Sequence, residues 1–196
     1  MNTSQLMASL CLAAFAAAAG AQTAADISQR DINQQTRIRN GLQDGSLTTR
    51  EAAVLERKEG RVARLQAQSL RDGKLSDPER ARINRAEDRV SADIRNARHN
   101  GAQGNPLSAS SQRMQHGVQR DIQQQQRIQD GVRSGQLSHR EVAVLERGQA
   151  RQDARQFRAG RDGHVSGHEA QAINQTQNAN SQRIHKLRHN ANPSPQ

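Results

Sequence analysis

Aromatic residues and cysteine are almost absent from this chain of 196 residues. The sequence contains two phenylalanines, no tyrosine, no tryptophan and a single cysteine, Cys11. One cysteine cannot build an internal disulfide framework. Without tyrosine or tryptophan, the chain also lacks the rings on which nucleic-acid bases usually stack. With so few large apolar residues, any hydrophobic core must be small.

Charged residues are absent from positions 1–21, and the stretch from Leu6 to Ala19 is apolar. Ala19-Gly20-Ala21 has the small-x-small form of a signal-peptidase site. We therefore expect a signal peptide over 1–21, a mature chain that begins at Gln22, and a periplasmic or secreted protein. Because Cys11 lies in the removed segment, the mature chain would have no thiol. No later stretch of the sequence is long and apolar enough to span a bilayer.

Four short segments share one pattern: Gly, any residue, an aliphatic residue, Ser or Thr, two free positions, and Glu. Glycine closes a helix because it enters the left-handed conformation without steric cost. Ser/Thr-x-x-Glu is a capping box, which satisfies the free amides at the start of the next helix. The pattern therefore predicts four corners, each ending one helix and starting another, at residues 44–51, 72–79, 134–141 and 162–169.

The corners belong to a unit that is duplicated without gaps. Glu51 and Glu141 are separated by 141 − 51 = 90 positions, and the same shift aligns Gln29-Arg30-Asp31-Ile32 with Gln119-Arg120-Asp121-Ile122. Internal repetition of this kind determines the architecture, so the fold has to be interpreted as two copies of one unit. We predict an all-α fold made of tandem duplicated three-helix units joined by a flexible linker. The expected divisions are a first repeat over 22–100, a linker over 101–115, a second repeat over 116–190 and a disordered tail over 191–196.

Apolar periodicity places three helices in the first repeat. They are expected over about 27–40, from near Thr48, and after Ser76. The apolar stripes are thin, so each three-helix unit should be only marginally stable alone. The third helix of the second repeat has the weakest pattern, because Ile173 is the single large apolar residue between Ala170 and Gln182.

The formal net charge is +10, from 29 basic and 19 acidic residues. The basic residues are mostly arginines interleaved with acids, as in Glu56-Arg57-Lys58-Glu59, which is typical of a solvated helix face. A nucleic-acid surface would more often show a clustered basic stripe or aromatic residues. We therefore expect no specific nucleic-acid partner. Net charge favours a weak, salt-sensitive affinity for an anionic envelope component, or binding to a protein not identified by the sequence.

The corners resemble the second half of an EF-hand loop. In a twelve-residue loop from Asn40 to Glu51, Asp44, Thr48 and Glu51 stand at the fifth, ninth and twelfth positions, where that family places ligands. Leu42 stands at the third position, where the family needs an oxygen ligand. The resemblance implies weak calcium binding through Asn40, Asp44, Thr48 and Glu51. Helix capping explains Thr48 and Glu51 equally well, so purely structural corners are the alternative.

The same corners resemble the L-T-x-x-Q motif of Spy/CpxP-type periplasmic proteins. The matching residues are Leu47-Thr48-x-x-Glu51 and Leu137-Ser138-x-x-Glu141, with Glu in place of Gln. That family implies client holding or metal sensing by a cradle-shaped helical dimer.

His185 and His189 are four residues apart on a predicted helix, a spacing that suits a transition metal such as zinc or copper. Surface histidines are the alternative, since no carboxylate or thiol follows them closely enough to complete a ligand set. The sequence contains no phosphate loop, no nucleophile elbow and no recognisable pair of catalytic carboxylates. We interpret the remaining acids as capping residues or partners in surface ion pairs.

These patterns predict an exported, non-enzymatic helical binding or scaffold protein with vestigial EF-hand-like loops. No catalytic residue and no cofactor is expected, and weak calcium binding stays open. The alternatives are a Spy/CpxP-like periplasmic chaperone or metal-stress factor, and a weak calcium-binding module.

Overall fold

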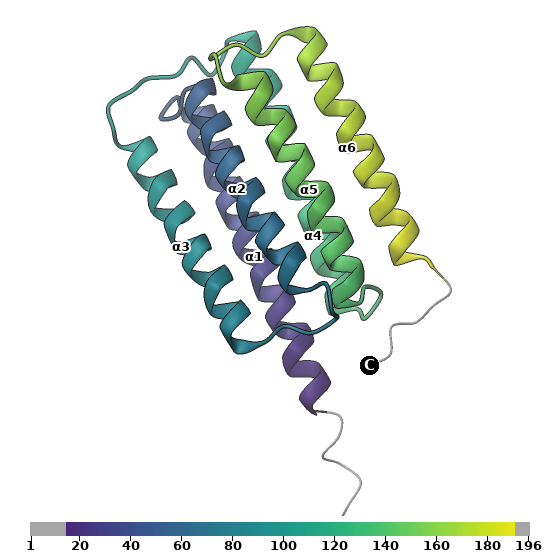
Figure 1. Cartoon of the computed structure of the whole chain (residues 1–196). Helices are drawn as coiled ribbons and strands as arrows, with labels where there is room; N and C mark the ends of the chain where they lie inside the picture. The colour runs from purple at the N-terminus through teal and green to yellow at the C-terminus, as the bar shows by residue number, and fades with distance from the viewer. Residues whose placement is uncertain (1–14, 191–196) are drawn as a thin grey trace, which may run out of the picture.

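The computed structural model describes residues 15–190, with side chains from Ala25 onward, and contains six α-helices (Figure 1). Their bounds are α1 Phe15–Asp44, α2 Thr49–Ser69, α3 Asp77–Arg98, α4 Ala109–Arg133, α5 His139–Gly160 and α6 Gly167–Arg188. All regular structure in this part of the chain is helical, which confirms the predicted all-α class. Within 15–190, no helix combines the length and the hydropathy that a bilayer span requires.

The four predicted corners are confirmed. The corner glycines Gly45, Gly73, Gly135 and Gly163 adopt φ between 70° and 91°. After each of them, the corner glutamate accepts a hydrogen bond of 2.9–3.0 Å from the backbone N–H of the Ser or Thr three residues earlier. Each corner therefore ends one helix and satisfies a free amide at the start of the next.

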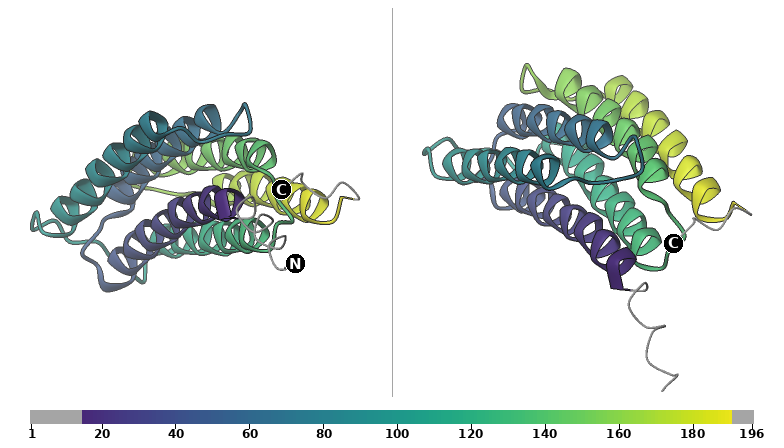
Figure 2. Two further views of the ribbon diagram at one scale, coloured as in Figure 1. Left: turned by 90° about the horizontal axis from the view of Figure 1, so that it is seen from below. Right: turned by 60° about the horizontal axis from the view of Figure 1, so that its bottom comes forward.

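The helices form two layers, with α2 and α5 over α1 and α4 (Figure 1, Figure 2). The most extensive pairings join each of these helices to its counterpart in the other repeat, α1 to α4 and α2 to α5. Helix α3 packs on α1 and α2 at one edge, and α6 packs on α4 and α5 at the other. Because α1 packs on α4 and α2 on α5, residues ninety positions apart in the sequence face one another near the centre.

Two apolar clusters fill the interior, and each draws residues from both repeats. The first contains Ile38, Leu42 and Val62 together with Met114, Val118 and Ile173. The second contains Ala25 and Leu70 together with Ile128, Leu145 and Ile184. The thin apolar stripes of one repeat are thus completed by the other, so the two repeats share one interior.

Helix α1 is longer than the expected 27–40. It begins at Phe15, runs through Ala19-Gly20-Ala21, and ends at Asp44. Its last turn continues past Asn40. There the backbone O of Gly41 accepts the N–H of Leu47 at 2.8 Å. The Leu47 side chain packs so closely on Gly41 that an added Cβ at this position would lie only 2.7 Å from it. Residues 1–14 of the expected signal peptide and the expected tail at 191–196 lie outside the described residues.

The expected linker over 101–115 is helical in its second half, because α4 begins at Ala109. The Ser108 hydroxyl accepts the N–H of Ser111 at 3.1 Å and caps the helix. The preceding connection is seated on the first corner, where the N–H of Gly104 donates to the backbone O of Gly45 at 2.8 Å. A Cβ on Gly104 would lie 2.3 Å from the backbone O of Leu47. The connection is therefore shorter and more closely packed than expected.

Helix α6 is regular over 22 residues despite its weak apolar pattern. Its buried face consists of Ile173, Gln177, Asn180 and Ile184. Gln177 donates to the backbone O of Gly117 at 2.8 Å, and Asn180 donates to a Gln152 oxygen at 2.9 Å. Buried hydrogen bonds replace apolar contacts on this face, which is why apolar periodicity underestimated the helix.

Candidate metal centre in the helical core

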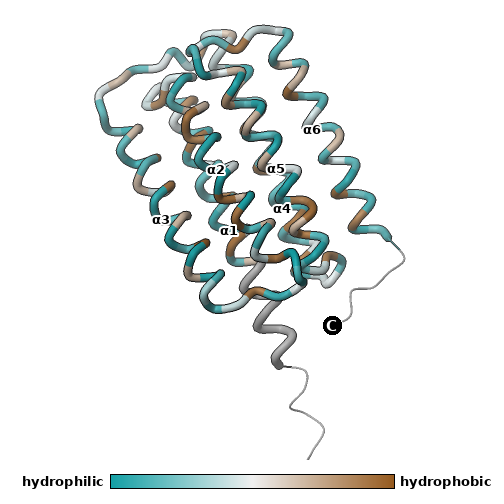
Figure 3. The backbone as a smooth tube through the Cα atoms, viewed as in Figure 1, coloured by the Kyte–Doolittle hydropathy of each residue, from teal (hydrophilic) through white to brown (hydrophobic). Residues whose placement is uncertain are grey.

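Buried polar side chains lie among the residues of the two apolar clusters. Along α4, Asp121, Gln124 and Gln125 occur between Val118 of the first cluster and Ile128 of the second, in a stretch that also contains Ile122 of the first cluster. Hydrophilic stretches interrupt the apolar ones along the inner helices in the same way (Figure 3). We call this set the polar layer; its members are Asp31, Gln34, Gln35, Glu56, Glu59, Gln66, Glu87, Asp121, Gln124, Gln125, Glu146, Gln149, Gln152, Asp153, Gln156, Gln177 and Asn180.

Six acids of the polar layer form what we call the carboxylate cluster: Asp31, Glu56, Glu59, Asp121, Glu146 and Asp153. Each exposes at most 6% of its surface. Among the described residues, no lysine, arginine or histidine nitrogen lies within 4.0 Å of any of these six carboxylates. An ionised carboxylate without a partner costs several kcal/mol in such an environment. The cluster must therefore be neutralised by protons or by a cation.

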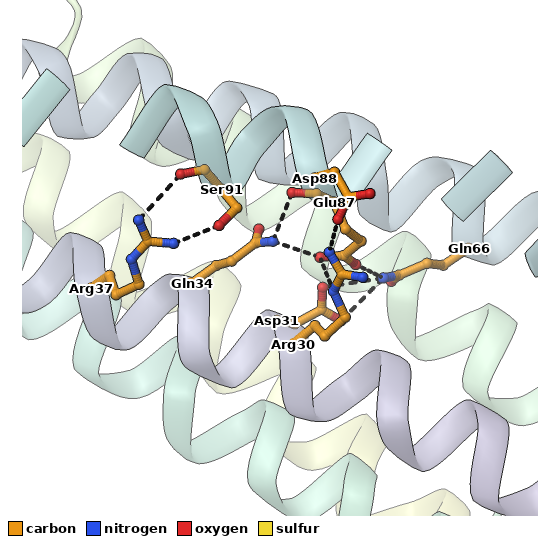
Figure 4. Close-up of polar contacts among 8 residues, drawn as sticks. All are labelled: Arg30, Asp31, Gln34, Arg37, Gln66, Glu87, Asp88 and Ser91. Atoms are coloured by element: carbon orange, nitrogen blue, oxygen red, sulfur yellow. Dashed lines mark hydrogen bonds and ion pairs between the residues drawn. The ribbon is translucent and has the colours of Figure 1, made fainter. Parts of the chain in front are cut away.

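The first repeat holds its central acid, Asp31, beside a second acid from α3. Glu87 lies beside Asp31, and Gln66 donates to both carboxyl groups at 3.0–3.1 Å (Figure 4). Gln34 donates to Glu87 at 2.7 Å, and the Arg30 Nε lies 3.9 Å from the same carboxylate. Two neighbouring carboxyl groups in this geometry share a proton when no cation is bound.

The second repeat surrounds its equivalent acid with amides instead. Asp121 accepts hydrogen bonds from Gln152, Gln156 and Gln177, with a donor–acceptor distance of 2.8 Å for Gln177. Gln177 stands where the first repeat has Glu87. Amide donors favour the ionised form of the acid they bind, so these three side chains oppose the effect of burial on the pKa of Asp121.

A cavity of about 20 Å³ lies at the centre of the layer. Its lining consists of four pairs of equivalent residues from the two repeats: Asp31 and Asp121, Gln35 and Gln125, Glu59 and Gln149, and Ala63 and Asp153. The cavity therefore lies between the two repeats, with equivalent residues of each repeat on its lining. Its volume suffices for one water molecule or one unhydrated ion.

Three carboxylates beside this cavity meet the spacing of a metal site. Oxygens of Glu56, Asp121 and Asp153 all lie within 4.8 Å of one another, and all three residues are buried. They come from α2, α4 and α5, so both repeats contribute. Within the described part of the chain, this is the one group of three or more acidic, histidine or cysteine side chains at such spacing.

Oxygen atoms without donors surround the same place. One side-chain oxygen each of Gln35, Glu56, Glu59 and Gln125 is buried without a hydrogen-bond partner among the described residues. Three of these four side chains line the cavity. A buried acceptor without a donor carries a desolvation cost of about 1–3 kcal/mol. A cation in the cavity would remove that cost for several oxygens at once.

The electrostatics of the cluster follow from burial and like charge. Burial raises the pKa of Asp121 to about 7, against the lowering effect of its amide donors, and raises the pKa of Glu146 to about 8. Burial, reinforced by neighbouring carboxylates, raises the pKa of Asp31, Glu56, Glu59 and Asp153 well above the usual range. Without a cation the cluster therefore retains protons near neutral pH.

The donor set determines which cations suit the site. Apart from Ala63, the side chains that line the cavity carry carboxylates or carboxamides, and none of the cavity-lining or group-forming residues is a histidine or cysteine. Oxygen-only sets favour calcium, magnesium or manganese over zinc and copper. A cavity this small has no room for the retained waters of magnesium, whereas calcium exchanges its waters for flexible protein oxygens.

The corner residues expected to bind calcium have protein donors on their oxygens. Asp44 accepts hydrogen bonds from the N–H and hydroxyl of Ser46 and from Arg98, which outweigh partial burial and lower the pKa of Asp44. Glu51 accepts from Thr48 through one carboxylate oxygen and from Asn100 through the other. Asn40, in the last turn of α1, accepts from Arg39. These contacts are those of a helix corner.

His185 and His189 lie at the end of α6 with ring centroids 4.3 Å apart. The Nδ1 of His189 donates to the backbone O of His185 at 2.8 Å, which closes the helix end. The structure thus brings the two rings together on the surface. No third histidine, cysteine or acid of the described chain joins them at ligand spacing.

Our interpretation of the acids as capping or surface residues was wrong for the polar layer. A signal was present: Glu56 and Glu59 fall on the same helix face as Ala52 and Ala63, and Glu56 recurs as Glu146 at the repeat spacing. An acid on the apolar face of a helix is expected to be buried, and a buried acid needs a partner or a function, whereas an exposed acid needs neither. Apolar periodicity alone ignores them.

Comparison with protein-family models, with curated proteins and with solved structures finds no match. The candidate function therefore rests on the residues of this chain.

Proposed function

We propose that the protein is an exported, non-enzymatic helical binding protein that holds a divalent cation in its core. Calcium is the cation that the donor set and the cavity favour. The observation that carries the proposal is the buried Glu56–Asp121–Asp153 group beside a one-ion cavity whose lining includes side chains with unpartnered oxygens. Export rests on the signal-peptide pattern of residues 1–21.

Charge balance supports a cation in this position. A dication in the cavity would offset the charge of two ionised carboxylates. Without it, burial keeps these carboxyl groups protonated. The ligands come from α2, α4 and α5, so binding would tie the two repeats together at the point where their interior is polar. The bound ion would act on the stability of the shared interior, which is a structural role.

The scaffold role expected from the sequence is compatible with such an ion. We further infer that the chain arose by duplication of a three-helix unit, with residues 99–108 as the connection. A Spy/CpxP-like holdase remains a separate proposal, but a client would find little apolar surface: among the described residues, Leu107 and Val144 are the exposed large hydrophobic side chains. Suppression of client aggregation at substoichiometric amounts would support that alternative.

Thermal unfolding with and without calcium tests the metal proposal. Calcium at ten times its dissociation constant should raise the melting temperature by about 3–6 °C relative to chelator. Asp153→Asn should remove this rise, because it deletes one of the three grouped carboxylates. In chelator, the same variant should melt higher than the unsubstituted protein, because it removes an uncompensated buried acid.

Asp44→Ala is the matched control, since it removes the acid of the first corner and leaves the core intact. It should keep the full calcium response. A response that survives Asp153→Asn and vanishes in Asp44→Ala would place calcium at the corner and contradict the core site. The absence of any response to calcium, magnesium or manganese would contradict metal binding altogether.

A further inference from the structure

Helix α5 carries a row of arginines on one face. Arg147, Arg151, Arg155 and Arg158 follow one another at intervals of four, four and three residues, which places them on one side of a helix. With Arg64 from α2 and Thr176 from α6, they line a surface cleft of about 410 Å³ whose remaining lining is Ala150 and Ala154. We call this the arginine cleft; it is separate from the carboxylate cluster.

The five arginines have no partners within the described part of the protein. None of them lies within 4.0 Å of a carboxylate, and none donates a hydrogen bond to another described residue. All five are exposed. Like charges one helical turn apart repel one another, so the row reduces stability unless an anion occupies the cleft.

The first repeat shows how such charges are otherwise paired. There α3 supplies Asp88 to Arg30 and Asp93 to Lys58, each at 2.6 Å. In the second repeat the equivalent residues of α6 are Asn178 and Arg183, so the acids are missing. The single acid of α6, Glu169, caps the start of that helix, so α6 offers the arginines of α5 no carboxylate.

Only half of the row recurs in the first repeat. Arg151 corresponds to Arg61, and Arg147 to Arg57, whose guanidinium lies 4.5 Å above the centre of the Phe157 ring instead of lining a cleft. The positions equivalent to Arg155 and Arg158 are Leu65 and Gln68. Duplication therefore does not account for the complete row.

We propose that the arginine cleft binds a ligand that carries several phosphate groups. The planar guanidinium donates two parallel hydrogen bonds to a phosphate, and charge-assisted bonds of this kind are strong. Successive arginines are about 6 Å apart along the helix axis, at 1.5 Å per residue, so several phosphates of one ligand can be held at once. The cleft lining includes no aromatic ring, so nucleic-acid bases would have nothing to stack on.

Titration with inorganic tripolyphosphate in chelator, followed by calorimetry, tests the proposal without involving the carboxylate cluster. The protein should bind, and Arg151→Gln/Arg155→Gln should weaken binding by at least about tenfold, a loss of about 1.4 kcal/mol. The matched control is Arg85→Gln/Arg89→Gln on α3, which removes the same charge from two exposed residues outside the cleft. It should change the affinity by less than about twofold, as expected for screened charges.

Equal weakening by both double variants, or no binding of tripolyphosphate, would overturn the proposal, because net charge alone would then explain the affinity. Vesicles containing phosphatidylglycerol distinguish the source of the phosphate. Vesicle binding that depends on Arg151 and Arg155 assigns the cleft to lipid head groups, whereas binding of tripolyphosphate alone assigns it to a soluble ligand. A single-stranded oligonucleotide that binds more tightly than tripolyphosphate, with the same dependence, would replace the proposal with nucleic-acid binding.

Discussion

Asp31 and Asp121 occupy equivalent positions of the two repeats. Each is contacted by one side chain of an edge helix, α3 or α6, and these two side chains differ in their functional group. Asp31 faces the carboxyl group of Glu87, and Asp121 faces the carboxamide of Gln177. Burial first, and Glu87 second, raises the pKa of Asp31. The amide instead stabilises the charged form of Asp121. Glu87 thus adds to the rise that burial causes in the pKa of Asp31, whereas Gln177 opposes the corresponding rise at Asp121.

Exchanging these neighbours tests that difference. Glu87→Gln should raise the melting temperature in chelator at pH 8, because it removes one of two adjacent buried acids and supplies Asp31 with an amide donor. Gln177→Glu should lower it by several degrees, because a second carboxylate would lie within 2.8 Å of Asp121 without a new cation. Differential scanning calorimetry of the two variants provides the measurement. Shifts of the same sign would contradict the assigned roles.

The helix corners are the elements on which the fold depends. Their glycines take φ values that other residues adopt only with strain, and the capping glutamates bind the amides that follow. Asp44, Asp72 and Asp162 add a hydrogen bond from the backbone N–H two residues later at 2.9 Å. The aspartate that resembles an EF-hand ligand thus accepts a backbone hydrogen bond within its own corner at three of the four corners.

Gly163→Ala should destabilise the protein by about 1 kcal/mol, because alanine would have to adopt a φ near +91° at this corner. For a protein of this size the melting temperature would fall by about 2–4 °C. Gly167→Ala is the control four residues later. It has no neighbour within 4 Å of an added Cβ and lies in the first turn of α6, so it should leave the melting temperature unchanged or raise it. Equal losses would show that the conformation of Gly163 is not what matters.

The corners could be predicted from the sequence because their determinants are local: a glycine, a hydroxyl and a carboxylate within seven residues. The polar layer could not, because apolar periodicity treats Glu56 and Glu59 as breaks in a stripe and says nothing of what packs against them. Which face of α2 meets α5 depends on contacts between residues about ninety positions apart. The arginine row was visible in the spacing of Arg147, Arg151, Arg155 and Arg158, but the lack of a partner acid on α6 becomes significant only when that helix is placed beside it.

We expect the two repeats to unfold as one unit, since both apolar clusters and the polar layer draw residues from both repeats. The six carboxylates therefore titrate within one folding unit. Protonation of any of them contributes to the stability of the entire protein. Calcium and protons compete for the same oxygens, so binding of the cation should release protons.

This competition determines how stability depends on pH. A buried acid whose pKa is higher in the folded than in the unfolded protein binds its proton more tightly in the folded state. Its contribution is therefore fully present below the unfolded pKa and is lost as pH rises toward the folded pKa. For Asp121 the window extends from the ordinary aspartate value to about 7, and for Glu146 from the ordinary glutamate value to about 8. Each acid that is protonated only when folded removes about 1.4 kcal/mol per pH unit in this window.

In chelator, the melting temperature should consequently fall as pH rises from about 5 to 8, the interval set by these shifts. Saturating calcium should flatten that fall, because the cation replaces the protons that the cluster loses. Glu146→Gln should flatten it in part without calcium, whereas Glu141→Gln at the corner should not, since hydrogen bonds from Ser138 and Asn190 outweigh partial burial and lower the pKa of Glu141. Melting curves at fixed ionic strength across this interval provide the measurement. Stability that stays constant or rises with pH in chelator would mean that the buried acids are already compensated, and the case for a cation in the core would fail.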